Sequence, residues 1–225
     1  MAEHLIIAID GPAGAGKTTL GRMLARELGM LYIDTGSMYR AVALAVIESS
    51  TNETDDLTVG SLAERIDIDL AGDPDSLHVT LDGQDVTERI RDEDVTDMSS
   101  IISTIPAVRR AMVRRQRELG RRGAVMNGRD IGTVVFPAAD FKFFLTATPA
   151  ARAERRLAEE RQIDPAATYE ATFADMTERD RRDSTREDSP LVAAVDAVVL
   201  DTTGVPIDEV LRQMVSIVEK KSAGS

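Results

Sequence analysis

The feature that most constrains the fold is a glycine-rich loop between an apolar run and an amphipathic helix. The loop has the pattern G-x-x-x-x-G-K-T from Gly11 to Thr18. The apolar run 5–9 precedes it, and Leu20 and Leu24 follow at helical spacing. A strand, a glycine loop and a helix in this order can bind phosphate through backbone N–H groups and the helix N-terminus. The pattern predicts a nucleotide-binding α/β fold, but it does not say what happens to the phosphate.

The rest of the chain continues the alternation of short apolar runs with helical segments. Further strands are expected at 30–33, 124–126, 141–147 and 197–200. Strands that alternate with helices favour a parallel sheet covered on both sides. We therefore predict an α/β fold of the P-loop NTPase type, with a parallel five-stranded sheet and helices on both faces.

One segment departs from this pattern. Residues 66–70 and 77–81 alternate apolar with polar side chains, and turn residues lie between and after them. Such alternation is typical of antiparallel strands with one face in solvent. We expect a small, mostly antiparallel β insertion at residues 60–100, within a core formed by residues 1–59 and 101–225.

Composition narrows the function. The 225 residues carry a net charge of -12, which disfavours binding to nucleic acid. No apolar run is long enough to cross a membrane, and the absence of cysteine excludes disulfides. Arginines nevertheless gather at 108–122, 151–156 and 178–186. Most of them belong on solvated helix faces, but together they could form a pocket for a small polyanion. We expect a cytoplasmic monomer.

The phosphate loop alone leaves a switch, a motor and a transferase open. A GTPase switch should carry a guanine-reading Asn-Lys-x-Asp, and a motor should carry an apolar run that ends in an acidic pair. Neither pattern is found. A phosphoryl transferase needs a second anion site opposite the loop, and arginines suit it because they are permanently charged and bidentate toward phosphate. Arginine-bearing segments follow several predicted strands, whose ends meet at one crevice in such folds.

Longer motifs resemble those of bacterial cytidylate kinases, the nucleoside monophosphate kinases for CMP and dCMP. The resemblance rests on five segments spread over nearly the whole chain and on the ending "DAVVLDTT". These segments are "IDGPAGAGKTT", "YIDTGSMYRAVAL", "DVTERIRDEDV", "NGRDIGTVVFPAADFKFFLTA" and "ERDRRDSTREDSPL". The resemblance implies transfer of the γ-phosphoryl group of ATP to CMP or dCMP.

The resemblance also implies roles for individual residues. ATP would be bound by Gly11, Pro12, Ala13, Gly14, Ala15, Gly16, Lys17, Thr18 and Thr19. CMP would be bound by Thr35, Arg40, Ser100, Arg109, Arg129, Asp130, Arg179, Asp183 and Arg186. The catalytic charges would come from Lys17, Arg129, Arg155 and Arg179. The Thr18 hydroxyl would ligate Mg²⁺ together with the nucleotide phosphates. Residues 150–170 would form a helical lid over ATP.

Several points stay open. Thr35 stands where some relatives have Ser, and Asn127 stands where an acidic residue can occur. Asp10 could orient a loop or take part in catalysis, and we favour orientation. A kinase for another small acceptor, such as a different monophosphate or shikimate, is a second enzymatic reading. A regulatory nucleotide-binding module without turnover is the alternative from another class.

Overall fold

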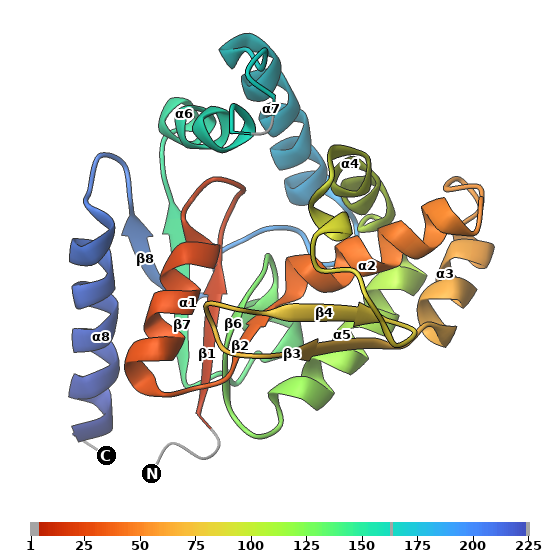
Figure 1. Cartoon of the computed structure of the whole chain (residues 1–225). Helices are drawn as coiled ribbons and strands as arrows, with labels where there is room; N and C mark the ends of the chain where they lie inside the picture. The colour runs from red at the N-terminus through yellow and green to blue at the C-terminus, as the bar shows by residue number, and fades with distance from the viewer. Residues whose placement is uncertain (1–4, 163, 224–225) are drawn as a thin grey trace.

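The computed structural model describes residues 5–162 and 164–223, and the side chains up to residue 220. Its main sheet has five parallel strands in the order β2-β6-β1-β7-β8. The strands are β1 (Ile6–Asp10), β2 (Tyr32–Asp34), β6 (Ala124–Asn127), β7 (Phe141–Thr146) and β8 (Val198–Asp201). The predicted parallel α/β fold is confirmed. Figure 1 shows the carboxyl ends of these strands on one edge of the sheet, beside the phosphate loop.

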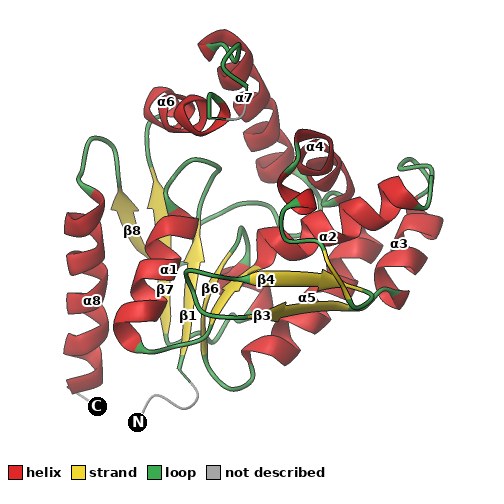
Figure 2. Ribbon diagram, in the orientation of Figure 1, coloured by secondary structure: helices red, strands yellow, loops and turns green. Residues whose placement is uncertain are grey.

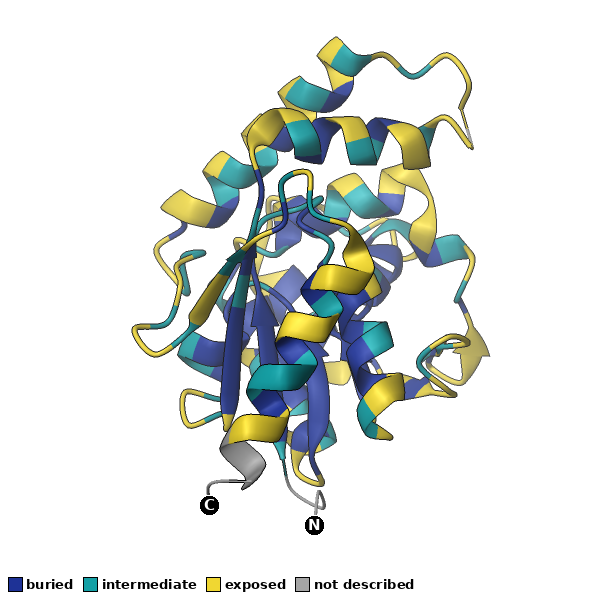
Figure 3. Ribbon diagram, turned by 90° about the vertical axis from the view of Figure 1, so that its left-hand side faces the viewer, coloured by how far each residue is buried: buried dark blue, intermediate teal, exposed yellow. Residues whose placement is uncertain are grey.

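Helices cover both faces of the main sheet, because successive apolar side chains of β1 point to opposite faces and are buried on both. Ile7 and Ile9 belong to a buried cluster with α1 (Lys17–Leu28) and α8 (Ile207–Ala223). Ala8 belongs to the opposite cluster, with α2 (Thr35–Glu48) and α5 (Pro106–Gly120). In Figure 3 the inner strands of the main sheet are buried behind the helices, whereas the edge strand β8 is largely exposed.

Local residue chemistry sets the helix ends that matter for the site. Helix α1 begins after Gly16 and ends before Gly29, and both glycines are in the left-handed region, with φ of 89° and 62°. The Asp34 carboxylate caps α2 by accepting a hydrogen bond from the backbone N–H of Gly36 at 3.0 Å. As predicted, Pro106 lies in the first turn of α5.

The insertion contains the expected antiparallel meander. Its strands are β3 (Ile68–Ala71), β4 (His78–Leu81) and β5 (Gln84–Asp85). Val79 and Leu81 are buried in the cluster that contains α2, so the meander packs on the core through one face. Helices α3 (Asp56–Arg65) and α4 (Glu93–Ile102), with the short 3₁₀ turn η1 (Arg89–Arg91) before α4, were not predicted. The expected boundaries at 60 and 100 fall inside these two helices, and the division into subdomains stays a prediction.

Two helices lie across the carboxyl edge of the sheet. They are α6 (Pro149–Glu160) and α7 (Tyr169–Thr185), which pack against each other near the glycine loop (Figures 1 and 2). A single π turn, η2 (Ile131–Val135), follows β6. The expected lid, residues 150–170, covers most of α6 and only the first two residues of α7, and its closure over ATP stays a prediction. The π turn begins within the "NGRDIGT" segment. Residue 163 of the expected lid lies outside the described residues.

Candidate active site

The phosphate loop joins β1 to α1 and has a conformation that requires glycine. Gly11 has a φ of 143°, and a Cβ there would lie 2.1 Å from the carbonyl oxygen of Leu145. Lys17 is buried at the start of α1, and its ammonium donates a hydrogen bond to the carbonyl oxygen of Pro12 at 2.6 Å. Thr18 and Thr19, in the same turn, are exposed. The loop therefore presents the charge of Lys17 at the carboxyl edge of the sheet.

Two arginines act electrostatically on Lys17. Burial lowers the pKa of Lys17 well below its usual value, and the charges of Arg129 and Arg179 lower it further. Arg129 follows β6 and Arg179 lies on α7, so three segments distant in sequence bring positive charge to one place. Such an arrangement disfavours a further cation and favours a polyanion such as a nucleotide phosphate.

The two arginines differ in how they are held. The Nε of Arg129 donates to a carboxylate oxygen of Asp183 at 2.8 Å. Arg179 forms no hydrogen bond or ion pair within the described part of the chain. Burial and the charge of Arg129 lower the pKa of Arg179 to about 10. Burial raises the pKa of Asp183, but Arg129 and Arg186 outweigh it and hold that pKa below its ordinary value. Arg179 is thus a half-buried charge that an anionic ligand could stabilise.

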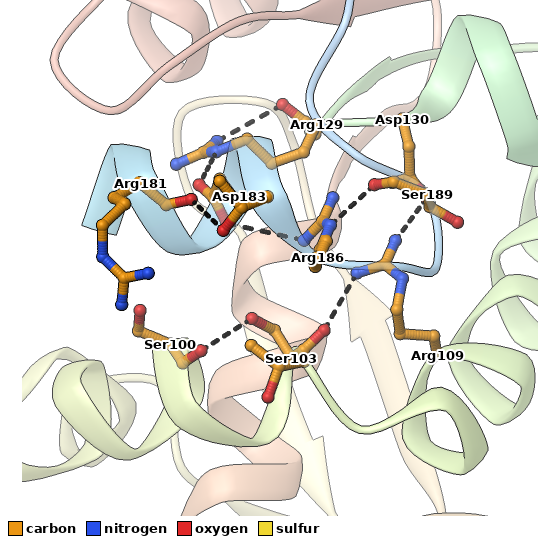
Figure 4. A network of polar contacts seen from close by, with 12 residues as sticks. Ser100, Ser103, Arg109, Arg129, Asp130, Arg181, Asp183, Arg186 and Ser189 are labelled. Carbon is orange, nitrogen blue, oxygen red and sulfur yellow. Dashed lines mark hydrogen bonds and ion pairs between the residues drawn. The ribbon is translucent and has the colours of Figure 1, made fainter. Parts of the chain in front are cut away.

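A second group of polar side chains lies beside this charge cluster (Figure 4). The buried guanidinium of Arg109, on α5, pairs with the buried carboxylate of Asp130. Arg109 also donates to the carbonyl oxygen of Ser103 at 3.2 Å, and its guanidinium carbon lies 5.7 Å from the centre of the Tyr39 ring. One simple expectation is that Asp130 pairs with its neighbour Arg129. The structure shows instead that Asp130 pairs with Arg109, whereas Arg129 pairs with Asp183.

The remaining predicted acceptor residues surround this pair. Ser100 is buried on α4, and its hydroxyl has no partner among the described residues. Arg186 donates from Nε to the carbonyl oxygen of Ser189 at 2.6 Å, whereas its Nη2 is buried without a partner. At the start of α2, Thr35 donates to the carbonyl oxygen of Asn127 at 2.8 Å. Arg40, one turn further along α2, donates to the Ser37 hydroxyl at 2.8 Å and pairs with Asp34 at 3.3 Å.

Asp10 orients a loop, although not the phosphate loop. Its two carboxylate oxygens accept hydrogen bonds from the backbone N–H groups of Ile131 and Gly132 at 2.8 and 2.7 Å. Burial raises the pKa of Asp10 to about 6, although these two N–H groups partly oppose the shift. Asp10 thereby fixes the π turn that carries Arg129 and Asp130 next to the phosphate loop.

Asn127 contacts both sides of the site. Its side-chain oxygen accepts from the Tyr32 hydroxyl at 3.1 Å, and its amide nitrogen donates to the Thr18 hydroxyl at 3.4 Å. The sequence gives only one sign of this role, which is that Asn127 stands where an acidic residue can occur.

The lid arginines are not placed alike. Arg152 and Arg155 donate to backbone carbonyls of the phosphate loop, and Arg155 also contacts Thr202. Arg156 instead pairs with Glu159 and Glu160 on its own helix, at 3.4 and 2.8 Å. Arg152 lies in the expected lid, but its contact with the phosphate loop was not predicted. Sequence reasoning missed Thr202 as a residue of the site, since it belongs to no phosphate-binding pattern.

The fold and the site define a P-loop phosphotransferase that can bind a second, anionic substrate opposite its nucleotide. The family model described as "Cytidylate kinase" matches residues 7–220. The chain belongs to the cytidylate kinase family, and it is therefore an ATP-dependent nucleoside monophosphate kinase.

Individual relatives support this assignment over the whole chain. The cytidylate kinase of Desulforamulus reducens is 49% identical over 222 residues, which cover 98% of this chain and 99% of that protein. The cytidylate kinase of Bacillus subtilis is 43% identical over 223 residues, which cover 99% and 100%. The crystal structure of an uncharacterized protein from Eubacterium ventriosum superposes with a TM-score of 0.53 at 10% identity, over 96% of this chain and 98% of that one. That last likeness concerns the fold alone.

Proposed function

We propose that residues 11–19 bind ATP, that the cluster of polar side chains around Arg109 and Asp130 binds CMP or dCMP, and that the γ-phosphoryl group passes between them. The observation that carries this proposal is the convergence of Lys17, Arg129 and Arg179. Donor and acceptor phosphates repel each other, so a kinase with a phosphate acceptor needs positive charge at this place.

These three charges would stabilise the transferring group. An oxygen of the acceptor phosphate attacks the γ-phosphorus in line while the bond to the β-phosphate oxygen breaks. The acceptor is already an anion, so no general base has to remove a proton. Lys17 and the two arginines then offset the charge that spreads over the transferring oxygens. Arg155, the fourth expected catalytic charge, is bound to the phosphate loop instead.

The cluster of polar side chains beside these charges suits a cytosine nucleotide. Cytosine presents an exocyclic amino donor next to ring acceptors, and the neighbouring Asp130, Arg109 and Ser100 offer the matching acceptor and donors. Ser100 Oγ and Arg109 Nε are buried without partners in the described structure, so a ligand could satisfy both. We assign Asp183 and Arg186 to the ribose, and Thr35 and Arg40 to the acceptor phosphate.

Magnesium fits this site only as an ion bound together with the nucleotide. No group of three or more His, Cys, Asp or Glu side chains in the described residues could hold a metal by itself. The exposed Thr18 hydroxyl, next to Asn127, would supply one oxygen ligand, and the phosphates would supply others. The bound ion would neutralise phosphate charge.

None of the helices in the described residues is long and apolar enough to cross a membrane. We propose that the chain works as a cytoplasmic monomer without nucleic acid. The net charge of -12 and the small-molecule substrates of the reaction support this proposal.

A coupled assay of ADP release tests the function with each nucleoside monophosphate in turn. We expect CMP and dCMP to give the largest kcat/KM, and the same series determines their order and the tolerance for UMP. If another nucleoside monophosphate gives the largest kcat/KM, the side chains around Arg109 and Asp130 recognise the base of that nucleotide instead. Nucleotide binding without acceptor-dependent ADP release would favour a regulatory module.

A further inference from the structure

The outward side of the phosphate loop is bound by side chains that lie outside the loop. Three consecutive carbonyl oxygens accept such hydrogen bonds: Ala13 from Arg152 at 3.1 Å, Gly14 from Arg155 at 3.2 Å and Ala15 from Thr202 at 3.3 Å. The Thr202 hydroxyl shares its single hydrogen between Ala15 and the carbonyl oxygen of Thr146 at 3.1 Å, so this third bond is the weakest of the three. We call Arg152, Arg155 and Thr202 the outer donor set. They come from helix α6 and from the end of strand β8.

The direction of these bonds matters because a peptide group is planar and trans. Its C=O and its N–H point in opposite directions, so fixing one carbonyl directs the N–H of the next residue the other way. Carbonyls of residues 13–15 that are bound from outside therefore direct the N–H groups of residues 14–16 toward the inner side of the loop. Inward N–H groups form the concave site that binds phosphate.

The two arginines of the set are fully engaged. Arg152 is 5% exposed, donates from Nε to the carbonyl oxygen of Ala147 at 3.2 Å and pairs with Asp180 at 2.7 Å. Arg155 donates to the hydroxyl of Thr202 at 2.9 Å and to its carbonyl oxygen. Turning either guanidinium toward a phosphate would break several of these bonds.

Packing holds the loop against the same helix. Gly14 has a φ of 70°, and a Cβ there would lie 2.9 Å from the carbonyl oxygen of Arg152 and 3.0 Å from Met176 Cε. The loop therefore packs tightly against the first turn of α6 and against α7. Arg152, Arg155 and Arg156 lie close together on α6, so their charges would be expected to repel one another. In the structure each guanidinium instead contacts carbonyl oxygens or carboxylates, which offset its charge.

We propose that the outer donor set holds the phosphate loop in its binding conformation before nucleotide arrives. Arg152, Arg155 and Thr202 are then positioning residues, and Arg155 acts on the loop rather than on the transferring phosphate. The proposal rests on the proposed function only in taking residues 11–19 as the nucleotide site. Arg156, whose partners are glutamates of its own helix, has no part in it.

Amide hydrogen exchange of the nucleotide-free protein tests this directly, with calorimetric binding of ADP as a second readout. Thr202→Val keeps the shape and removes an uncharged hydroxyl, together with its bonds to Thr146 and from Arg155, and Arg155→Gln removes a charge. We expect both variants to speed exchange at residues 13–18 and to weaken ADP binding, each by about 5–10-fold, since a net hydrogen bond has about this effect. The matched control, Arg156→Gln, should leave exchange at the loop unchanged.

Steady-state kinetics separates positioning from a direct role in transfer. In the outer-donor variants the KM for ATP should rise, while kcat at saturating ATP falls much less. The proposal is overturned if Arg155→Gln lowers kcat about 100-fold or more with loop exchange and ADP affinity unchanged, because a direct charge contact has that effect. It is equally overturned if Thr202→Val changes neither exchange nor ADP affinity. Neither readout needs an acceptor, so failure to phosphorylate CMP would refute the proposed function alone.

Discussion

The donor side and the acceptor side of the site differ in how their hydrogen bonds are completed. Around the phosphate loop, the carbonyls of residues 12–15 all accept bonds from side chains. On the acceptor side, buried side-chain atoms lack partners among the described residues, namely Arg40 Nε, Ser100 Oγ, Arg109 Nε and Arg186 Nη2. Four more such atoms are found, on Arg115, Thr133, Asp180 and Arg182. Asp180 pairs with Arg152 on the donor side, so the two sides differ in the number of such atoms and not in their complete absence from one side.

This difference shows two ways of preparing a binding site. A loop that binds phosphate through backbone N–H groups needs a fixed shape, and side chains outside it supply that shape. A site that recognises a base needs unused hydrogen-bonding capacity, and buried atoms keep it free of competing water. The donor side should thus respond to mutation through loop geometry, and the acceptor side through ligand affinity.

The largest effect is expected from Lys17→Ala, which removes charge from the donor side. Turnover should fall about a hundredfold or more, since a lost transition-state charge contact typically costs ~3 kcal/mol or more. The fold should survive, because Lys17 is buried next to two arginines that disfavour its charge. ADP release and circular dichroism check both statements. Near-normal turnover in the folded variant would refute the role of Lys17.

Asp130→Asn sharpens the comparison from the acceptor side. The variant keeps an oxygen near Arg109 but removes the charge that faces the base site. The kcat/KM for CMP should fall about 10–100-fold, the range of a hydrogen bond to a charged group. The KM for ATP should change little. Equal losses for both substrates would show that Asp130 only supports the packing of Arg109.

Asp10 joins the two sides, and its raised pKa gives a pH dependence. A carboxyl whose folded pKa is about 6 instead of 3.8 favours the folded state only while it is protonated. The free energy of unfolding should therefore fall as pH rises from about 4 to about 6, by ~3 kcal/mol from this group. Chemical denaturation of the wild type and of D10N, which cannot titrate here, measures the difference. A pH-independent difference between the two proteins would contradict the assignment.

The smallest effect is expected from Ser100→Ala. The Ser100 hydroxyl has no partner in the described structure, so its loss should leave the free energy of unfolding nearly unchanged. The KM for CMP should rise about fivefold, because the ligand loses one neutral hydrogen bond.

Its neighbour Ser99 provides the matched control. Ser99 is also buried, but its hydroxyl donates to the carbonyl oxygen of Thr96 at 2.7 Å. Ser99→Ala should lower the stability by about 1 kcal/mol and leave the KM for CMP unchanged. If the two variants behave alike, the unpartnered hydroxyl has no special role in binding.

Local patterns in the sequence were enough to predict much of the fold. The loop at 11–18, the five strands and the antiparallel meander depend on glycine positions and on apolar periodicity within a few residues. Helices α3 and α4 were missed because their apolar faces are short and contain small or polar buried residues, such as Gly60 and Ser99.

The partners of the charged side chains were decided by the tertiary structure. Asp130 pairs with Arg109 instead of its neighbour, Arg155 binds the loop instead of remaining free, and Asp10 holds a turn more than a hundred residues away. The sequence alone determined which reactive and binding side chains this chain contains and which strands and helices carry them, because periodicity and motif spacing are local properties. Which groups meet depends on the strand order β2-β6-β1-β7-β8, which brings distant strand ends to one edge. Because these side chains are buried at that edge, each ion pair and hydrogen bond is electrostatically stronger than it would be in water.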